Sequence, residues 1–146
     1  MITFFSLTNP SKVVLIYSRK EVQGTWSDGG HYWNREHVWP KSLGGFGTSG
    51  AGADLHHLRP EDPVVNSTRN NFPFGEVKSG NKVKMSTQNG GEYTDNYLGG
   101  GYFEPQDCAK GDVARILMYM YMHYSKEVSA NSSNSRVCCI GVSAGV

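Results

Sequence analysis

Alternating and continuous apolar runs predict the regular structure of the first half of the chain. Residues 12–18, "KVVLIYS", form a β-branched apolar run that is typical of a buried strand. Residues 31–39, "HYWNREHVW", are aromatic-rich and predict an extended segment that Pro40 stops. A second short strand is expected over residues 54–58, "DLHHL", before Pro60.

A glycine-rich loop and a helix complete this part of the pattern. Residues 43–53 hold five glycines in eleven positions, which predicts a loop between the two extended segments. In "EDPVVNSTRNNFP", Asp62 is suited to cap a helix, Pro63 fits its first position, and Pro73 forbids its continuation. The order across residues 31–71 is therefore strand, loop, strand and helix.

The second half predicts a hairpin, a loop and the longest helix. Residues 76–86 form the expected hairpin, turning at Ser79-Gly80-Asn81, and residues 87–101 form a polar, glycine-rich loop. In "GDVARILMYMYMHYSK", Asp112 is the expected cap, and helical spacing relates the apolar positions 113, 116, 117, 120 and 124. Met118 and Met122 widen the apolar surface, which favours a helix packed on more than one side, with His123 in a structural role.

Composition limits the class of protein. The chain has 146 residues and a formal net charge of +1, which suits one domain and excludes a basic tail as the means of binding a partner. No apolar run approaches the length of a transmembrane helix, and the N-terminus lacks the positive region of a clear signal peptide. Three cysteines without a CxxC pair argue against a disulfide framework. A monomer is expected, with one domain over 1–128 and an atypical or truncated tail over 129–146.

The candidate chemistry lies in the segment "NREHVWPKS", where Glu36 and His37 are adjacent. Pairing of the two predicted strands would bring His37 near His56 and His57. A neutral histidine can activate water near pH 7, since its unperturbed pKa is about 6.5. A carboxylate can hold a metal ion that stabilises a phosphorane and a departing oxygen.

The predicted helix supplies a second set of polar side chains. Asn66, Arg69 and Asn70 follow the i, i+3, i+4 spacing, so they share one helix face. Arginine matches phosphate oxygens, and an asparagine carbonyl oxygen is a normal ligand of Mg²⁺. One difficulty is local: adjacent strand residues point to opposite faces, so Glu36 and His37 can share a site only if the chain bends.

Three motifs in order resemble a known family. "WNREHVWPKS", "ADLHHLRP" and "VNSTRNNFPFG" are similar to segments of the bacterial endonuclease I family, which belongs to the His-Me finger, or ββα-metal, nucleases. The resemblance covers most of the chain and implies an α+β fold with a ββα-metal core, additional helices and a hairpin. It also implies a sequence-nonspecific endonuclease that cuts DNA, and often RNA, leaving 5′-phosphate ends.

The resemblance also implies the roles of individual residues. His37 would be the general base, Glu36 and Asn66 would bind Mg²⁺, with Mn²⁺ or Ca²⁺ as substitutes, and Arg69 would fall on the arginine of the family's helix. A phosphate contact is inferred for Arg69, and Lys41 is suited either to a phosphate contact or to simple solvation. Many family members are exported, which implies an extracellular or periplasmic protein. The chain departs from the family in its short loop and in its C-terminal segment.

Two other classes of protein stay open. The first is a noncatalytic nucleic-acid-binding domain or an inactive truncated relative. The second is a structural zinc module built from histidines and a cysteine, although the spacing fits no standard zinc pattern. Arg35 is favoured as a structural ion-pair partner, and the lysines of "KSGNKVK" form a small basic surface that suits either phosphate contact or protection of a sheet edge.

Overall fold

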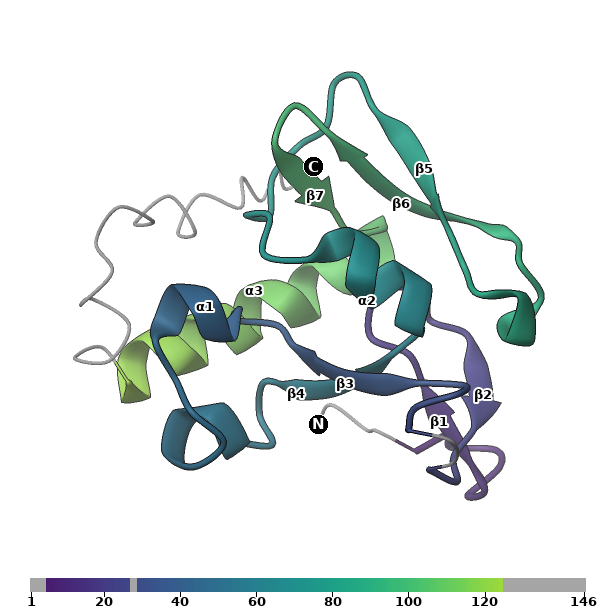
Figure 1. The fold of residues 1–146 in the computed structure, drawn as a ribbon, viewed down its shortest axis with the longest axis horizontal. Helices are drawn as coiled ribbons and strands as arrows, with labels where there is room; N and C mark the ends of the chain where they lie inside the picture. Colours follow the sequence, from purple (N-terminus) through teal and green to yellow (C-terminus); the bar gives the residue numbers. More distant parts are fainter. Residues whose placement is uncertain (1–4, 27–28, 125–146) are drawn as a thin grey trace.

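A two-stranded antiparallel hairpin, followed by a short helix, forms the middle of the fold (Figure 1). This computed structural model describes residues 5–26 and 29–124, so the predicted tail lies outside the described residues. Strand β3 (Asn34–His37) pairs with β4 (Leu58–Glu61), with Glu36 opposite Arg59 and His37 opposite Leu58. Helix α2 (Pro63–Arg69) follows directly and packs against β3 and β5. The predicted order of strand, loop, strand and helix is confirmed.

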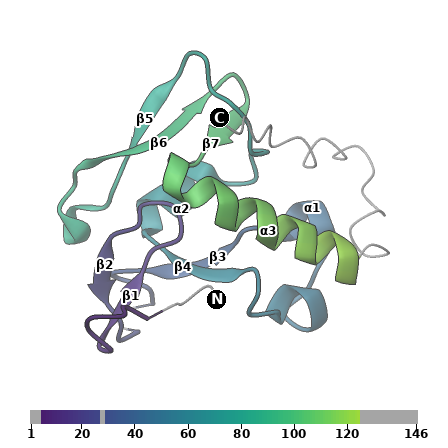
Figure 2. The ribbon, with the colours of Figure 1, turned by 180° about the vertical axis from the view of Figure 1, so that it is seen from behind.

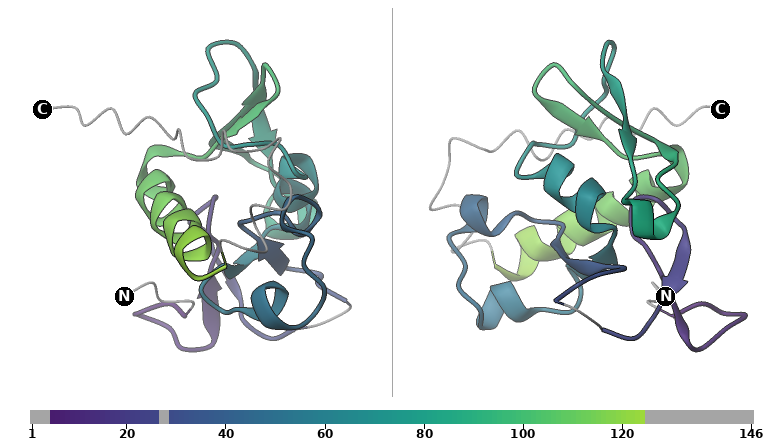
Figure 3. Two further views of the ribbon diagram at one scale, coloured as in Figure 1. Left: turned by 90° about the vertical axis from the view of Figure 1, so that its left-hand side faces the viewer. Right: turned by 45° about the vertical axis from the view of Figure 1, so that its right-hand side comes forward.

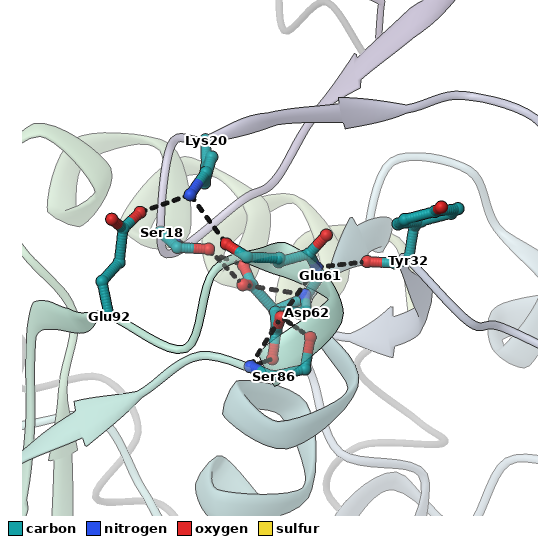
Figure 4. Close-up of polar contacts among 8 residues, drawn as sticks. Ser18, Lys20, Tyr32, Glu61, Asp62, Ser86 and Glu92 are labelled. Atoms are coloured by element: carbon teal, nitrogen blue, oxygen red, sulfur yellow. Dashed lines mark hydrogen bonds and ion pairs between the residues drawn. The ribbon is translucent and has the colours of Figure 1, made fainter.

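Helix α2 begins as its sequence predicts. The Asp62 carboxylate accepts hydrogen bonds from the backbone N–H groups of Val64 (2.9 Å) and Val65 (3.1 Å), and Pro63 occupies the first turn. The same carboxylate accepts a bond from the Ser86 hydroxyl at 2.7 Å, which ties the start of the helix to a distant segment (Figure 4). The adjacent Glu61 is also buried and accepts a bond from Ser18 Oγ at 2.5 Å. These carboxylates fix α2 relative to the N-terminal segment.

The boundaries predicted for the second strand were wrong. Residues 55–57 form a turn, and β4 begins only at Leu58 and continues through Pro60. The cause is local, because the Asp54 carboxylate accepts a bond from the His56 backbone N–H at 2.7 Å and closes an Asx-type turn. Pro60 is tolerated because β4 is one edge of a two-stranded sheet.

Several other elements differ from their predicted extents. The first strand, β1 (Lys12–Val14), is short and pairs with β2 (Glu21–Gln23). The hairpin predicted over 76–86 is replaced by β5 (Asn81–Lys84) pairing with β6 (Tyr93–Gly99), which then pairs with β7 (Tyr102–Glu104). The predicted loop over 87–101 therefore contains the longest of the described strands. The glycine-rich connection between β3 and β4 includes two helical turns, α1 (Lys41–Gly44) and η1 (Gly50–Ala53), and a further turn, η2 (Thr87–Asn89), precedes β6.

The last helix, α3 (Asp107–His123), begins earlier than predicted. Asp112 lies inside it, where it accepts a hydrogen bond from Arg19 at 2.5 Å instead of capping the helix. Figures 2 and 3 show α3 on the opposite side of the molecule from α2. It buries one face and leaves Met118 and Met122 exposed by 64% and 74%, so the prediction of a helix buried on several sides was wrong. His123 is exposed near the end of α3, and its structural role stays a prediction.

Aromatic and aliphatic side chains from every part of the described chain meet in one core. Its fully buried members include Leu15, Tyr17, Val38, Phe74, Phe103, Val113, Ile116 and Met120. The small antiparallel sheets and separate helices around this core make an α+β fold, as predicted. None of the described helices is long and apolar enough to cross a bilayer.

Candidate active site

His37 lies at the end of β3, where a hydrogen bond fixes its ring. Its Nε2 is 3.0 Å from the carbonyl oxygen of Gly52 in η1. A carbonyl oxygen can only accept, so Nε2 must carry the hydrogen, and in the neutral ring Nδ1 keeps its lone pair. No hydrogen-bond partner of Nδ1 occurs in the described part of the chain. The geometry leaves His37 with one nitrogen occupied and the other able to accept a proton.

The surroundings of His37 favour its neutral form. Burial lowers the pKa of the imidazole, the bond to Gly52 raises it, and the nearby charges of Lys41 and Arg35 lower it further. The net effect is a pKa below the ordinary histidine value. His37 is therefore mostly unprotonated at neutral pH, which is the state that a general base requires.

A second histidine, His57, supports the loop that holds His37. Its side chain is fully buried, and its Nε2 lies 2.7 Å from the carbonyl oxygen of Ala51, next to Gly52. The His37 and His57 rings meet edge to face with their centroids 5.3 Å apart. Burial lowers the pKa of His57 to about 4, so it stays neutral. Two neighbouring imidazoles thus bind two neighbouring carbonyls of one loop, and the predicted proximity of these histidines is confirmed.

The same loop is fastened to α3 through Asp54. Its carboxylate accepts bonds from the hydroxyls of Tyr124 (2.7 Å) and Tyr119 (3.0 Å) and from His56. Burial opposes ionisation of Asp54, but hydrogen bonds from Tyr124, His56 and Tyr119 outweigh it and hold its pKa at about 2. His56 stacks on Tyr119, with centroids 4.1 Å apart. His56 therefore links the loop to α3.

His37 lines a pocket of about 380 Å³ that carries positive charge. Arg35 and Lys41 line it beside His37, together with Trp26 and Asn34. None of the described residues that line this pocket is an aspartate or a glutamate. Lys41 is exposed at the start of α1, so its predicted phosphate contact is sterically accessible but stays a prediction. The arrangement suits an anion beside an unprotonated imidazole.

Glu36 points to the opposite face of β3 from His37, as strand alternation requires. It is 3% exposed, accepts a hydrogen bond from the Tyr17 hydroxyl at 2.5 Å, and lies 3.3 Å from the Arg69 guanidinium. Burial raises the pKa of Glu36, although Arg69 and Tyr17 both act to lower it. In this structure Glu36 is therefore one member of a buried network between β3, α2 and the N-terminal segment.

Asn66 lies one turn before Arg69 on α2 and also faces β3. Its Nδ2 donates to Asn34 Oδ1 at 2.6 Å and to the Arg35 carbonyl at 3.4 Å. The Glu36 side chain thus projects toward α2, and the Asn66 side chain projects toward β3. They offer a carboxylate and an amide oxygen, the donors that a hard divalent cation takes. The donor chemistry fits Mg²⁺, with water and substrate oxygens needed to complete its six ligands.

Arg69 is 1% exposed, and its guanidinium is held by protein groups. It donates to the carbonyls of Val38 (2.9 Å) and Asn70 (3.0 Å), pairs with Glu36, and lies over the Phe74 ring at 4.5 Å. Such a guanidinium does not reach a phosphate on the surface without leaving these partners. The position supports a structural role instead of the predicted phosphate contact.

Several of these contributors carry little signal in the sequence. Tyr17 belongs to an apolar strand-like run, and Gly52 is one of many glycines, so neither stands out as a partner of Glu36 or His37. Arg35, favoured as an ion-pair partner, lies over the Trp26 ring instead. For the zinc hypothesis, residues 5–26 and 29–124 contain no group of three or more His, Cys, Asp or Glu side chains arranged to hold a metal ion.

The fold and this pocket define an α+β protein with a fixed, unprotonated imidazole beside two cationic side chains. The chain belongs to the endonuclease I family, whose model matches residues 2–143. Over 123 residues it is 47% identical to a protein of Bacillus subtilis (strain 168) named extracellular ribonuclease, and 46% identical to one of the same name from Bacillus amyloliquefaciens. Each match covers 80% of this chain but only 38% of the relative's length.

Proposed function

We propose that this chain is a divalent-metal-dependent, sequence-nonspecific endonuclease that hydrolyses phosphodiester bonds and leaves 5′-phosphate ends. The observation that carries the proposal is the geometry of His37, with Nε2 held by Gly52 and Nδ1 available beside a basic pocket. Membership of the endonuclease I family supports the same reaction.

The residues of the pocket divide the chemistry between them. His37 Nδ1 accepts a proton from water as the water oxygen attacks phosphorus, and the bond from phosphorus to the 3′ oxygen breaks. Arg35 and Lys41 reduce the negative charge of the phosphate group as the attack proceeds. A 5′-phosphate and a 3′-hydroxyl result, with the proton returned to the leaving oxygen through solvent.

Glu36 and Asn66 would hold the metal, Mg²⁺ in the first instance, with Mn²⁺ or Ca²⁺ as substitutes. Because Glu36 and His37 leave β3 on opposite faces, the end of β3 would have to bend to bring this ion to the phosphate beside His37. The ion would then supply positive charge to the phosphate and to the departing oxygen. Because Glu36 is paired with Arg69, the cation would have to share the carboxylate with the guanidinium or take its second oxygen.

The names of the relatives support a substrate and a location. Their printed name, extracellular ribonuclease, supports RNA as a substrate and secretion of this chain, and DNA stays a second substrate on the family resemblance. We propose that the protein acts as a monomer.

One observation favours the alternative of a noncatalytic nucleic-acid-binding domain. The Glu36 carboxylate of this chain is already paired with the Arg69 guanidinium. In that case the basic pocket would bind phosphate without cleaving it.

Digestion of a supercoiled plasmid and of a fluorescent RNA, with Mg²⁺ or with EDTA, separates these functions. The proposal expects cleavage that EDTA abolishes and that His37→Ala slows by roughly two to four orders of magnitude. His31→Ala is the matched control, since His31 lies outside the pocket and packs edge-on against Tyr32. Wild-type rates in His37→Ala would remove His37 from the mechanism. No cleavage of either substrate with any divalent ion would establish the binding domain.

A further inference from the structure

Trp26 is a large apolar side chain left exposed at the edge of the His37 pocket. It is 45% exposed and is one of the residues that line the pocket. The Trp33 ring packs edge-on against it, with centroids 4.9 Å apart and an interplanar angle of 78°. Trp33 itself packs against the core and donates its Nε1–H to the Gly24 carbonyl at 3.3 Å. Trp33 therefore holds the Trp26 indole in place, and the exposed part of the indole does not pack in the core.

The cation nearest to Trp26 belongs to the same strand as His37. Arg35 precedes His37 by two residues, so the two side chains leave β3 on one face. Its guanidinium carbon lies over the Trp26 ring, 5.6 Å from the centroid. An indole, a guanidinium and an imidazole therefore follow one another along the pocket, which Lys41 also lines.

This order matches the order of chemical groups along a polynucleotide strand. A phosphate beside His37 would lie among the positive charges of Arg35 and Lys41. The base of an adjoining nucleotide would then lie beside the Trp26 indole. Tryptophan and arginine are the side chains on which unpaired bases stack, and such stacking tolerates any base because every base has a π-face.

We propose that Trp26 is the stacking platform for a nucleobase next to the scissile phosphate, and that it makes single-stranded nucleic acid the preferred form of the substrate. Bases within a duplex stack on their neighbours and offer no free face to an indole. The inference rests on the proposed function only in placing the phosphate beside His37, and it adds the contact that distinguishes single strands from duplexes.

Binding to short oligonucleotides tests the platform without requiring cleavage. In a His37→Ala background with Mg²⁺, Trp26→Ala should weaken binding of a single-stranded RNA or DNA about fivefold to 150-fold, the range measured for one base–aromatic stack. The same substitution should change duplex binding by less than about twofold, because a duplex exposes no base face. An abasic strand, which keeps its phosphates and lacks its bases, should bind Trp26→Ala and its parent equally.

Two further variants make the result specific. Trp26→Phe keeps an aromatic face and should retain most of the single-strand affinity, whereas Tyr121→Ala removes an aromatic side chain of similar exposure (51%) outside the pocket and should change nothing. An equal loss for normal and abasic strands would show that Trp26 only supports the fold and would overturn the platform. Unchanged single-strand binding in Trp26→Ala would do the same. Both outcomes are independent of cleavage, so they are distinguishable from failure of His37 as the base.

Discussion

Replacement of Arg69 by alanine distinguishes a structural arginine from one that binds phosphate. The substitution removes the cationic partner of the buried Glu36 carboxylate, which would keep its hydrogen bond from the Tyr17 hydroxyl. It also removes the hydrogen bonds to the carbonyls of Val38 and Asn70 and the cation above the Phe74 ring. Glu36, Val38 and Phe74 lie where water has little access, whereas Asn70 is exposed.

The expected cost is large because both charges are buried. The side chains of Arg69 and Glu36 are 1% and 4% exposed, so solvent does not screen their interaction. Removing one partner of such a pair costs about 3–5 kcal/mol. At roughly 2–4 °C per kcal/mol for a domain of this size, the midpoint of thermal unfolding should fall by about 6–20 °C. A neutral double variant, Arg69→Met with Glu36→Gln, should lose less than Arg69→Ala alone, because no uncompensated charge stays buried.

Urea unfolding of each variant gives the free energy of unfolding, and a salt titration of nucleic acid binding gives the number of phosphate contacts. Arg115→Ala is the matched control, since this arginine is 67% exposed and should change stability by less than about 0.5 kcal/mol. The structural account requires a large loss of stability in Arg69→Ala. A loss below about 1 kcal/mol, together with a salt slope shallower by about 0.9, would refute it and restore the phosphate contact.

Four further outcomes are expected. The rate of cleavage should rise with pH and level off by about neutrality, with its midpoint below the ordinary histidine pKa of about 6.5, because the surroundings of His37 lower its pKa; a midpoint above that value in the pH profile of kcat/KM would contradict this. His57→Ala should lower kcat roughly 10- to 100-fold with little change in KM, as the loop that orients His37 loosens, whereas His57→Asn should recover part of the rate by donating to the same carbonyl; equal kcat in wild type and His57→Ala would exclude the positioning role. Glu36→Gln and Asn66→Ala should each raise the Mg²⁺ concentration for half-maximal cleavage by at least roughly tenfold, and an unchanged metal requirement in both would move the metal elsewhere. Burial raises the pKa of Glu61 to about 7, so protonation of Glu61 stabilises the folded state; this stabilisation is full below about pH 4.5 and is lost as the pH rises towards 7. In urea unfolding from pH 4 to 8, Glu61→Gln should remove this pH-dependent loss of stability. Parallel curves of unfolding free energy against pH for the two proteins would show that the Glu61 pKa is not raised.

The elements that could be predicted from the residues alone are those whose cause is local. Asp62 and Pro63 set the start of α2 because a cap and a fixed φ act on adjacent residues. The 3.6-residue spacing of apolar positions located α3, although its first turn was missed since no side-chain cap marks Gln106. The strand that carries His37 was also predicted, whereas the second strand, expected over residues 54–58, lies at Leu58–Glu61. Local rules sufficed where the interacting groups lie within a few residues of one another.

The partners of the polar side chains depend on long-range packing and could not be predicted. Adjacent residues Glu36 and His37 face opposite sides of β3, and nothing in the sequence shows that one meets Arg69 and Tyr17 while the other meets the Gly52 carbonyl. Strand β6 lies among polar residues and glycines, so its side chains did not predict a strand. Its pairing with β5 and β7 comes from backbone hydrogen bonds more than from its side chains. Arg69 has the spacing of an exposed phosphate ligand, yet packing of α2 against β3 buries it. Long-range packing fixes burial, and burial decides whether a charged group binds a substrate or holds the fold together.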